Sequence, residues 1–362
     1  MTMKRKLYFA TLLLCLLFAV TIAPVAALEF NELCADYNPD VGEPSQDCLD
    51  YMTDFPEPLT AQVPLDGVTL ANFSYWRVGP EAVNLFDAPG GSVVGQIEAG
   101  FNFVRVVNTT DGWLQTQDGM WIAESDARWY EPSSFRGVLL LDNLEQPFAW
   151  VLGDILTVPA PGAEQSMETG RFLPRYTRIN LFAEYQAEDG WYWYMIGPNE
   201  WIEQRNISIP KLVERPEGVE GRWVAIDIYE QTIIAYEDDT PVFSTLVATG
   251  LPGTDTNEGI FQIWARVAND TMSGFTGAPN SYALQSVPWV MYFDDSISLH
   301  GTYWHDLFGF RRSRGCVNMT ISDARWLFDW TAQGEPNEDG EVVTYVYVYA
   351  SGDYQGDGPQ TK

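Results

Sequence analysis

The chain has 362 residues and a formal net charge of −30 at pH 7. A surface this acidic repels nucleic acid and anionic lipid, so neither is an expected partner. A chain of this length predicts two or three domains.

The first 27 residues have the pattern of a secretory signal peptide. The basic stretch Lys4 to Lys6 precedes an apolar run from Leu7 to Ile22, and small residues lead up to Ala27. We expect cleavage after Ala27, which would leave a charge of −33 because residues 1–27 carry three basic residues and no acid. The alternative is a retained membrane anchor, for which the apolar run is short. Cleavage predicts an exported protein of the cell wall, periplasm or extracellular space.

Residues 28–60 predict an extended, solvated N-terminal segment, because they carry nine acids and no Lys or Arg. In an oxidising compartment Cys34 and Cys48 can close a disulfide across a short loop. This pairing leaves Cys316 as the odd cysteine of the mature chain. An odd thiol in an exported protein indicates reactivity or intermolecular pairing, and the alternative is a buried structural thiol.

Residues 70–210 contain an internal repeat of short strand patterns. Each copy has an Asp-Gly-Trp turn followed by a Trp-Ile pair, and the turns begin at Asp111 and Asp189. Strands separated by Gly, Pro and Asp turns predict two small β-barrels, over residues 61–132 and 133–210. The pattern resembles bacterial SH3-like domains. Its repeated tryptophans are either barrel core or a surface on which a ligand stacks.

A linker rich in Pro, Glu and Gly, residues 211–221, precedes a β-rich domain over residues 222–350. The alternation that begins at Val224 predicts strands there. A capping-box pattern that begins at Thr320 predicts a short helix. Residues 351–362 are expected to be a tail.

The chemistry is expected around the motif Ser313 to Asn318. Cys316 follows His300 by sixteen residues, in a chain with only two histidines. An imidazole at a strand end can accept the thiol proton of a nucleophilic cysteine. We therefore predict Cys316 as the nucleophile and His300 as its base, and His305 is the rival base.

Two glycines flank these groups and let the backbone approach a reacting carbonyl. Gly301 follows the predicted base, and Gly315 precedes the nucleophile. Amide N–H groups near Gly315 and Cys316 are the predicted oxyanion donors. Ser313 either hydrogen-bonds His300 or holds the turn, and the sequence leaves both roles open.

These residues resemble the L,D-transpeptidase family, in which a histidine precedes Ser/Thr-His-Gly-Cys at this spacing. The positions that fit the pattern are His300, Ser313, Gly315, Cys316 and Asn318. Arg314 departs from the pattern, because the family usually has a second histidine there. The resemblance extends over about residues 221–350 and implies a β-rich catalytic domain that needs no metal or organic cofactor.

The resemblance implies acyl transfer between peptidoglycan stem peptides, giving 3→3 cross-links, by an enzyme expected to be a monomer. With water as acceptor the same site would be an L,D-carboxypeptidase. A wall peptidase of the papain-like type is another reading, although its cysteine precedes its histidine and here the order is reversed. A non-catalytic wall-binding protein is the third reading.

Arg311, Arg312 and Arg314 form the densest basic patch of the mature chain, directly before the predicted nucleophile. They could stabilise a thiolate, hold a substrate carboxylate, or pair with surface acids such as Asp306. The resemblance implies further substrate contacts. These residues are Tyr282, Trp289, Tyr292 and Asn318. For each of the three aromatic residues, packing in the β-core is the alternative.

Overall fold

The computed structural model describes residues 28–40, 42–141, 144–274, 278, 281–334, 336 and 340–352. The predicted signal peptide, residues 1–27, and all but the first two residues of the predicted tail lie outside this part. Within these ranges no helix is long and apolar enough to cross a membrane.

The structure is mostly β-sheet, which confirms the predicted fold class, and its helices are short. The described helices are α1 (Glu32–Ala35), α2 (Gln46–Asp54), α3 (Gly67–Asn72) and α4 (Ile321–Thr331), with 3₁₀ turns η1 (Glu124–Asp126) and η2 (Gln204–Asn206). None of the sheets in the described ranges closes on itself, so the two predicted barrels are not confirmed.

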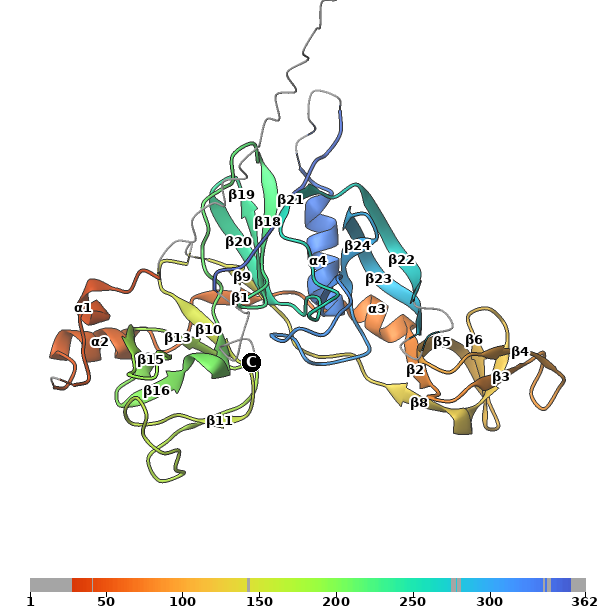
Figure 1. Ribbon diagram of the computed structural model, residues 1–362, viewed down its shortest axis with the longest axis horizontal. Coiled ribbons are helices and arrows are strands. Elements are labelled where there is room, and N and C mark those ends of the chain that lie inside the picture. The colour runs from red at the N-terminus through yellow and green to blue at the C-terminus, as the bar shows by residue number, and fades with distance from the viewer. Residues whose placement is uncertain are drawn as a thin grey trace, which may run out of the picture.

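A seven-stranded sheet forms one half of the C-terminal domain (Figure 1). In spatial order its strands are β1 (Thr60–Gln62), β9 (Val138–Leu140), β20 (Thr240–Leu246), β19 (Thr232–Glu237), β18 (Arg222–Asp227), β26 (Tyr345–Tyr349) and β21 (Gly259–Gln262). The interior strand β18 is buried on both faces. Val224 and Ile226 contact one core, and Trp223 and Ala225 contact the other.

An eleven-stranded sheet forms the other half and continues into the N-terminal region. Its main path is β25 (Val317–Met319), β24 (Ile297–Gly301), β23 (Tyr282–Asp294), β5 (Phe101–Thr110), β6 (Trp113–Thr116), β7 (Trp121–Ala123), β3 (Val83–Phe86) and β4 (Val93–Ile97). Beside this path, β2 (Ser74–Val78) pairs with β5 and β8 (Ala127–Tyr130), and β22 (Ala265–Gly274) pairs with β23.

Helix α4 lies between the two large sheets (Figure 1). Its Leu327 belongs to the same buried cluster as Ile226 on β18 and Leu299 on β24. The Thr320 hydroxyl caps the helix by accepting the N–H of Asp323 at 3.2 Å. The helix predicted from the capping box is therefore confirmed, and it supports the strand that carries His300.

The internal repeat reappears as a repeated order of elements. In the first copy β6, β7, η1 and β8 follow one another. The second copy has β15 (Tyr192–Gly197), β16 (Glu200–Glu203), η2 and β17 (Ile207–Ser208). Four tryptophans recur at matching positions in the two copies. Of these, Trp201 is buried, whereas Trp113, Trp121 and Trp191 are partly exposed. Core packing therefore accounts for only part of this pattern.

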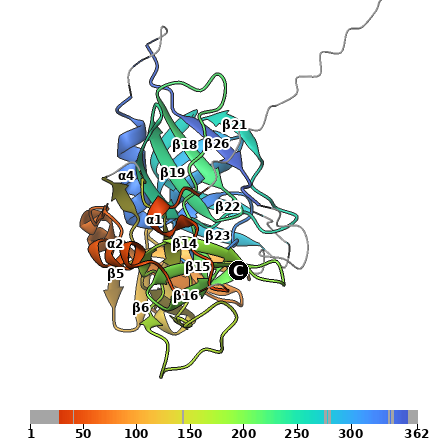
Figure 2. The same cartoon turned by 90° about the vertical axis from the view of Figure 1, so that its left-hand side faces the viewer.

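Three small sheets complete the second copy. They are β13 (Arg178–Asn180) with β10 (Phe148–Val151) and β17; β11 (Ile155–Leu156) with β12 (Phe172–Leu173); and β14 (Ala183–Gln186) with β15 and β16. Figure 2 shows α1 and α2 beside β14 and β15. The N-terminal helices thus cover this module.

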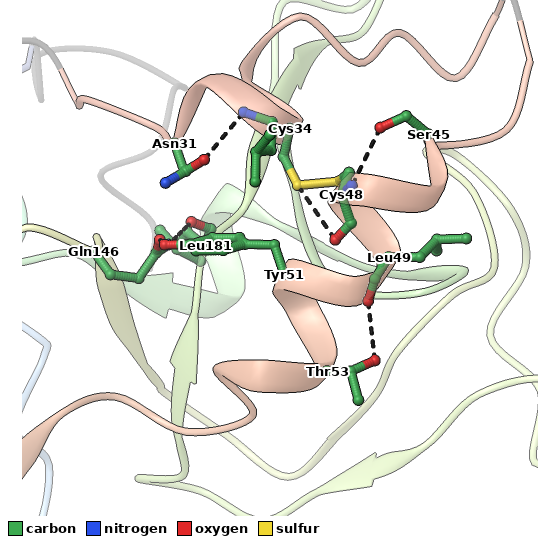
Figure 3. Close-up of a disulfide and its surroundings, with 10 residues drawn as sticks. Asn31, Cys34, Ser45, Cys48, Leu49, Tyr51, Thr53, Gln146 and Leu181 are labelled. Atoms are coloured by element: carbon green, nitrogen blue, oxygen red, sulfur yellow. Dashed lines mark hydrogen bonds between the residues drawn. A yellow bond between two sulfur atoms is a disulfide. The ribbon is translucent and has the colours of Figure 1, made fainter.

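Residues 28–60 are not extended, which corrects the prediction made from their charge. A disulfide joins Cys34 and Cys48, and the two short helices pack around it (Figure 3). Both cysteines and Met52 are buried in one cluster with Trp201. The acidic residues of the segment are exposed, and the buried cluster is formed by the two cysteines and Met52. The net charge of the segment therefore does not keep it extended.

The N-terminal region shares its sheets with the C-terminal domain. Strand β9 pairs with β20, and β5 runs parallel to β23 in the register Phe101↔Tyr282 and Phe103↔Leu284. The domain boundaries remain a prediction. These pairings mean that some strands of residues 61–210 belong to sheets shared with the C-terminal domain.

We predict that Gly301→Ala destabilises the protein. A Cβ at this position would lie 2.9 Å from Pro288 Cγ on β23 and 3.2 Å from Ile321 Cα on α4. Overpacking of this kind costs about 1–3 kcal/mol. Urea unfolding should show the loss, and Gly153→Ala is the control because a Cβ there meets nothing within 4 Å. Equal stabilities for the two variants would contradict the close packing of β24.

Candidate active site

Cys316 and His300 are brought together by neighbouring parallel strands. His300 lies on β24, and Cys316 directly precedes β25, in the register Leu299↔Val317 and His300↔Asn318. Side chains two residues apart on a strand share a face. Ser298 and His300 therefore face the same side as Cys316, and both predicted catalytic side chains line one cleft.

The thiol of Cys316 is protonated at neutral pH. Its sulfur lies 3.7 Å from Ser298 Oγ and 3.9 Å from the carbonyl oxygen of Ser296. Burial raises the pKa of the Cys316 thiol, and hydrogen bonds from Ser298 offset only part of this rise. Sequence reasoning missed Ser298, although its position two residues before His300 placed it on the same strand face.

His300 is a buried, neutral imidazole. Its Nδ1 lies 3.2 Å from the carbonyl oxygen of Gly301 and 3.4 Å from Thr302 Oγ1. A carbonyl oxygen only accepts, so Nδ1 carries the proton and Nε2 keeps a free lone pair. Burial lowers the pKa of His300 to about 4, with a smaller opposing effect of the Gly301 carbonyl. At neutral pH this ring can accept a proton through Nε2.

His305 has both ring nitrogens engaged. Its Nδ1 accepts the N–H of Leu307 at 3.2 Å, and the side-chain amide of Asn318 lies 2.9 Å from Nε2. The amide atom that faces Nε2 is the nitrogen of Asn318, which only donates. A neutral ring whose Nδ1 accepts carries its proton on Nε2, so we assign the Asn318 amide in the turned-over orientation, with its oxygen, which has no partner in the described ranges, accepting that proton. Burial and the nearby Arg312 lower the pKa of His305 to about 3. His305 is thus placed as a structural group.

Ser313 holds the nucleophile loop. Its Oγ donates to the carbonyl oxygen of Cys316 and accepts the N–H of Gly315 at 3.1 Å. Gly315 has a φ of 114°, which a residue with a Cβ adopts only with strain. Since the Gly315 N–H is engaged with Ser313, the N–H of Cys316 is the remaining candidate oxyanion donor.

The cleft beside Cys316 has a volume of about 600 Å³. A volume of this size suits a peptide or small-molecule ligand. The predicted residues that line it are Tyr282, His300, Arg312, Ser313, Arg314, Cys316 and Asn318. The guanidinium of Arg314 lies 4.7 Å from the centre of the Tyr282 ring, which places it along the cleft wall.

Three predicted substrate contacts lie elsewhere. Arg311 forms an ion pair with Asp255 at 3.2 Å and does not line the cleft. Trp289 donates from Nε1 to Asp66 at 2.9 Å and packs on α4. Tyr292 is not a lining residue; its hydroxyl donates to Asp270 at 2.8 Å.

The cleft also contains residues that sequence reasoning missed, because they come from the N-terminal region. These residues are Arg77, Phe101, Phe103, Tyr130 and Arg175. Phe101 and Phe103 reach the cleft because β5 pairs with β23, and Arg77 and Tyr130 lie on β2 and β8, which continue the same sheet. Arg175 comes from the second module and pairs with Asp306 at the cleft. No local motif marks them as site residues.

We predict that iodoacetamide alkylates Cys316 slowly at pH 7. Alkylation requires thiolate, and the raised pKa of Cys316 keeps the thiolate fraction low. The rate should keep rising about tenfold per pH unit beyond 8.5, the ordinary thiol value. The rate is followed by intact mass, with Ser298→Ala as the matched variant that should react more slowly still. A plateau below pH 8 would contradict a protonated resting thiol.

The site is a cleft in which adjacent strands bring together one cysteine thiol and one neutral imidazole. A family model matches this part of the chain: residues 221–348 are similar to the YkuD family, the L,D-transpeptidase catalytic domain. A comparison with curated proteins gives no match.

Solved L,D-transpeptidases match part of the chain. A cysteine-to-serine mutant of the Enterococcus faecium enzyme is 26% identical over 36% of this chain and 50% of its own, with a TM-score of 0.31. The enzyme from Stackebrandtia nassauensis is 25% identical over 37% of this chain and 58% of its own, with a TM-score of 0.28. L,D-transpeptidase 3 from Mycobacterium tuberculosis, solved with a faropenem-derived adduct, is 16% identical over 41% of this chain and 72% of its own, with a TM-score of 0.31. The chain thus spans between half and three fifths of the first two proteins.

Proposed function

We propose that this protein is a peptidoglycan L,D-transpeptidase that forms 3→3 cross-links through a thioester on Cys316. The observation that carries the proposal is the tautomer of His300. Its Nδ1–H faces the Gly301 carbonyl, so Nε2 is free to serve as a base beside a protonated thiol. The match of residues 221–348 to the catalytic-domain family supports the same reaction.

The first step consumes a donor tetrapeptide stem. The sulfur of Cys316 attacks the carbonyl carbon of the third residue while His300 Nε2 takes the thiol proton. The C–N bond to the terminal D-alanine then breaks, and the imidazolium returns the proton to the leaving amine. The Cys316 N–H is the proposed donor to the oxyanion. A thioester and free D-alanine result.

The second step transfers the acyl group to a second stem. A side-chain amine attacks the thioester carbonyl, the C–S bond breaks, and a new amide bond forms. His300 takes the proton that the amine loses and passes it to the departing sulfur, which restores the resting thiol. Water in place of the amine would release a tripeptide stem, which is the carboxypeptidase outcome.

We further propose that residues 61–132 and 133–210 are two SH3-like modules, and that the protein is exported and acts on the cell wall as a monomer. The repeated order of strands and 3₁₀ turn supports the modules. The basic and apolar pattern of residues 1–27 supports export.

The test is incubation of the purified mature protein with tetrapeptide stems. Mass spectrometry should detect the thioester adduct on the intact protein, free D-alanine and a cross-linked dimer. Tripeptide without dimer would indicate the carboxypeptidase instead. Neither adduct nor product, with a folded protein, would overturn the proposed function.

A further inference from the structure

The N-terminal region builds one wall of the active-site cleft. Because β5 pairs with β23, Phe101 and Phe103 lie beside Tyr282 and Leu284 across the sheet. All four of these residues line the cleft. The wall is therefore continuous from the catalytic domain into the first module, and residues from the first module line the same cleft as Cys316.

The interface under this wall is closely packed. Tyr303, on the loop that follows His300, is fully buried and stacks on Tyr75 of β2 with ring centroids 3.7 Å apart. Its hydroxyl donates to the carbonyl oxygen of Gln285 on β23 at 2.7 Å. A side chain on β2 thus keeps a fixed position relative to the nucleophile loop.

The cleft is cationic on a chain that is strongly acidic as a whole. Four arginines line it within the described ranges, Arg77, Arg175, Arg312 and Arg314, against a single carboxylate, Asp306. Asp306 is already engaged, because it pairs with Arg175 at 3.6 Å and accepts the Tyr176 hydroxyl at 3.2 Å. The basic groups therefore exceed what the lining acid can neutralise.

Arg77 and Arg312 carry the unneutralised charge. Both side chains are exposed, and neither forms an ion pair within the described ranges. Arg77 lies over the Phe101 ring, 5.5 Å from its centre, which aims it along the cleft wall. Tyr130 pairs with Tyr75 across β2 and β8, so it shares a sheet face with Arg77, and it also lines the cleft. The Asp306 carboxylate and both guanidinium groups act electrostatically on its hydroxyl. Two cations flanking a phenol form a binding arrangement for an anion.

We propose that Arg77, together with Arg312 and Tyr130, forms a carboxylate-binding subsite that holds a stem peptide in the cleft. This inference rests on the proposed function and adds that the first module takes part in substrate recognition. The stem offers two carboxylates, one on the diamino acid and one at the C-terminus. Both have the same chemistry for an arginine fork, and the test separates them.

Binding is measured by calorimetry in the full mature chain with Cys316→Ala, so that no turnover occurs. The probes are tetrapeptide stems with a free diamino-acid carboxylate and with an amidated one. The variant is Arg77→Gln. The control is Arg205→Gln. This change removes one positive charge from the second module, at a residue that does not line the cleft. Thermal unfolding checks that each variant is folded.

Loss of a charge-assisted contact should weaken binding of the free stem by about tenfold to a hundredfold in Arg77→Gln and leave Arg205→Gln unchanged. Arg312→Gln should behave like Arg77→Gln. If the diamino-acid carboxylate is the ligand, Arg77→Gln has no further effect on the amidated stem. If the C-terminal carboxylate is the ligand, both stems lose affinity, and a stem with an amidated C-terminus is insensitive to Arg77→Gln.

Three results would overturn the subsite: no change in Arg77→Gln, an equal loss in Arg205→Gln, or an equal loss with all three stems. These results leave the proposed function intact if the wild-type protein still forms the adduct and the dimer. Conversely, if a stem binds through Arg77 but the wild-type protein yields no product, the subsite is supported and the proposed transpeptidase activity is contradicted. If the Cys316→Ala protein with Arg77 intact binds no stem at all, the proposed subsite is contradicted.

Discussion

Replacing Cys316 by alanine should abolish thioester formation, D-alanine release and cross-linking, because no other thiol can take its place. Cys34 and Cys48 are joined in a disulfide, and Cys15 precedes the predicted cleavage site. Cys316 is a partly exposed residue, and its sulfur lies 3.7 Å from Ser298 Oγ, its nearest hydrogen-bond partner. Removing this sulfur should therefore change the stability little. Product analysis by mass spectrometry and thermal unfolding measure the two effects.

A matched control comes from the same loop. Arg311→Gln changes a residue that pairs with Asp255 and does not line the cleft, so it should keep most of the activity. Turnover by Cys316→Ala at more than background would exclude the cysteine mechanism. A large loss of activity in Arg311→Gln with an unchanged melting temperature would mean that the basic patch acts as a whole.

The parts of the site that the sequence predicts are those encoded locally. Cys316 and His300 stand at a recognisable spacing, and the Thr320 cap announces α4. Each of these signals depends on residues that are near one another in the chain. The motif spacing already favours His300 over His305. The structure adds the hydrogen-bond partners of each ring, which the neighbouring sequence does not encode.

The cleft wall could not be predicted in this way. Arg77 and Tyr130 reach the site through the pairing of β5 with β23, strands separated by well over a hundred residues. Strand register is set by which faces are buried and by turn geometry across the whole sheet, so no local pattern reveals this partnership.

Two errors have physical causes of the same kind. Residues 28–60 fold because Cys34, Cys48 and Met52 share one buried cluster. The overall charge composition of the segment, with its nine acids, does not reveal these few apolar positions. Trp289 adopts a φ of 59°, unusual for a bulky residue, and its indole turns to Asp66 and under the Arg325 guanidinium, 4.1 Å from the ring centre. A backbone reversal of this kind redirects a side chain that strand alternation would place differently.

His300→Ala should lower the acylation rate by about 10²–10⁴-fold, the usual loss when a positioned base is removed. The reason is that His300 alone of the two histidines has a ring nitrogen without a hydrogen-bond partner in the described ranges. In the protein with both histidines, acylation should fall as the pH drops through about 4, where protonation of His300 removes the base. The rate should not fall near pH 6.5, the ordinary histidine value.

His305→Ala should act on stability instead. The change leaves the Leu307 N–H and the Asn318 amide without their partner, and each buried unsatisfied group costs about 1–3 kcal/mol. Stopped-flow acylation, corrected for the folded fraction by urea unfolding, separates the two variants. His305→Ala should retain the decline toward pH 4, because the base that titrates there is still present, whereas His300→Ala should lose it. Equal rate losses in both variants, or a pH profile that changes only in His305→Ala, would transfer the role of base to His305 and require the opposite assignment of protons on the two rings.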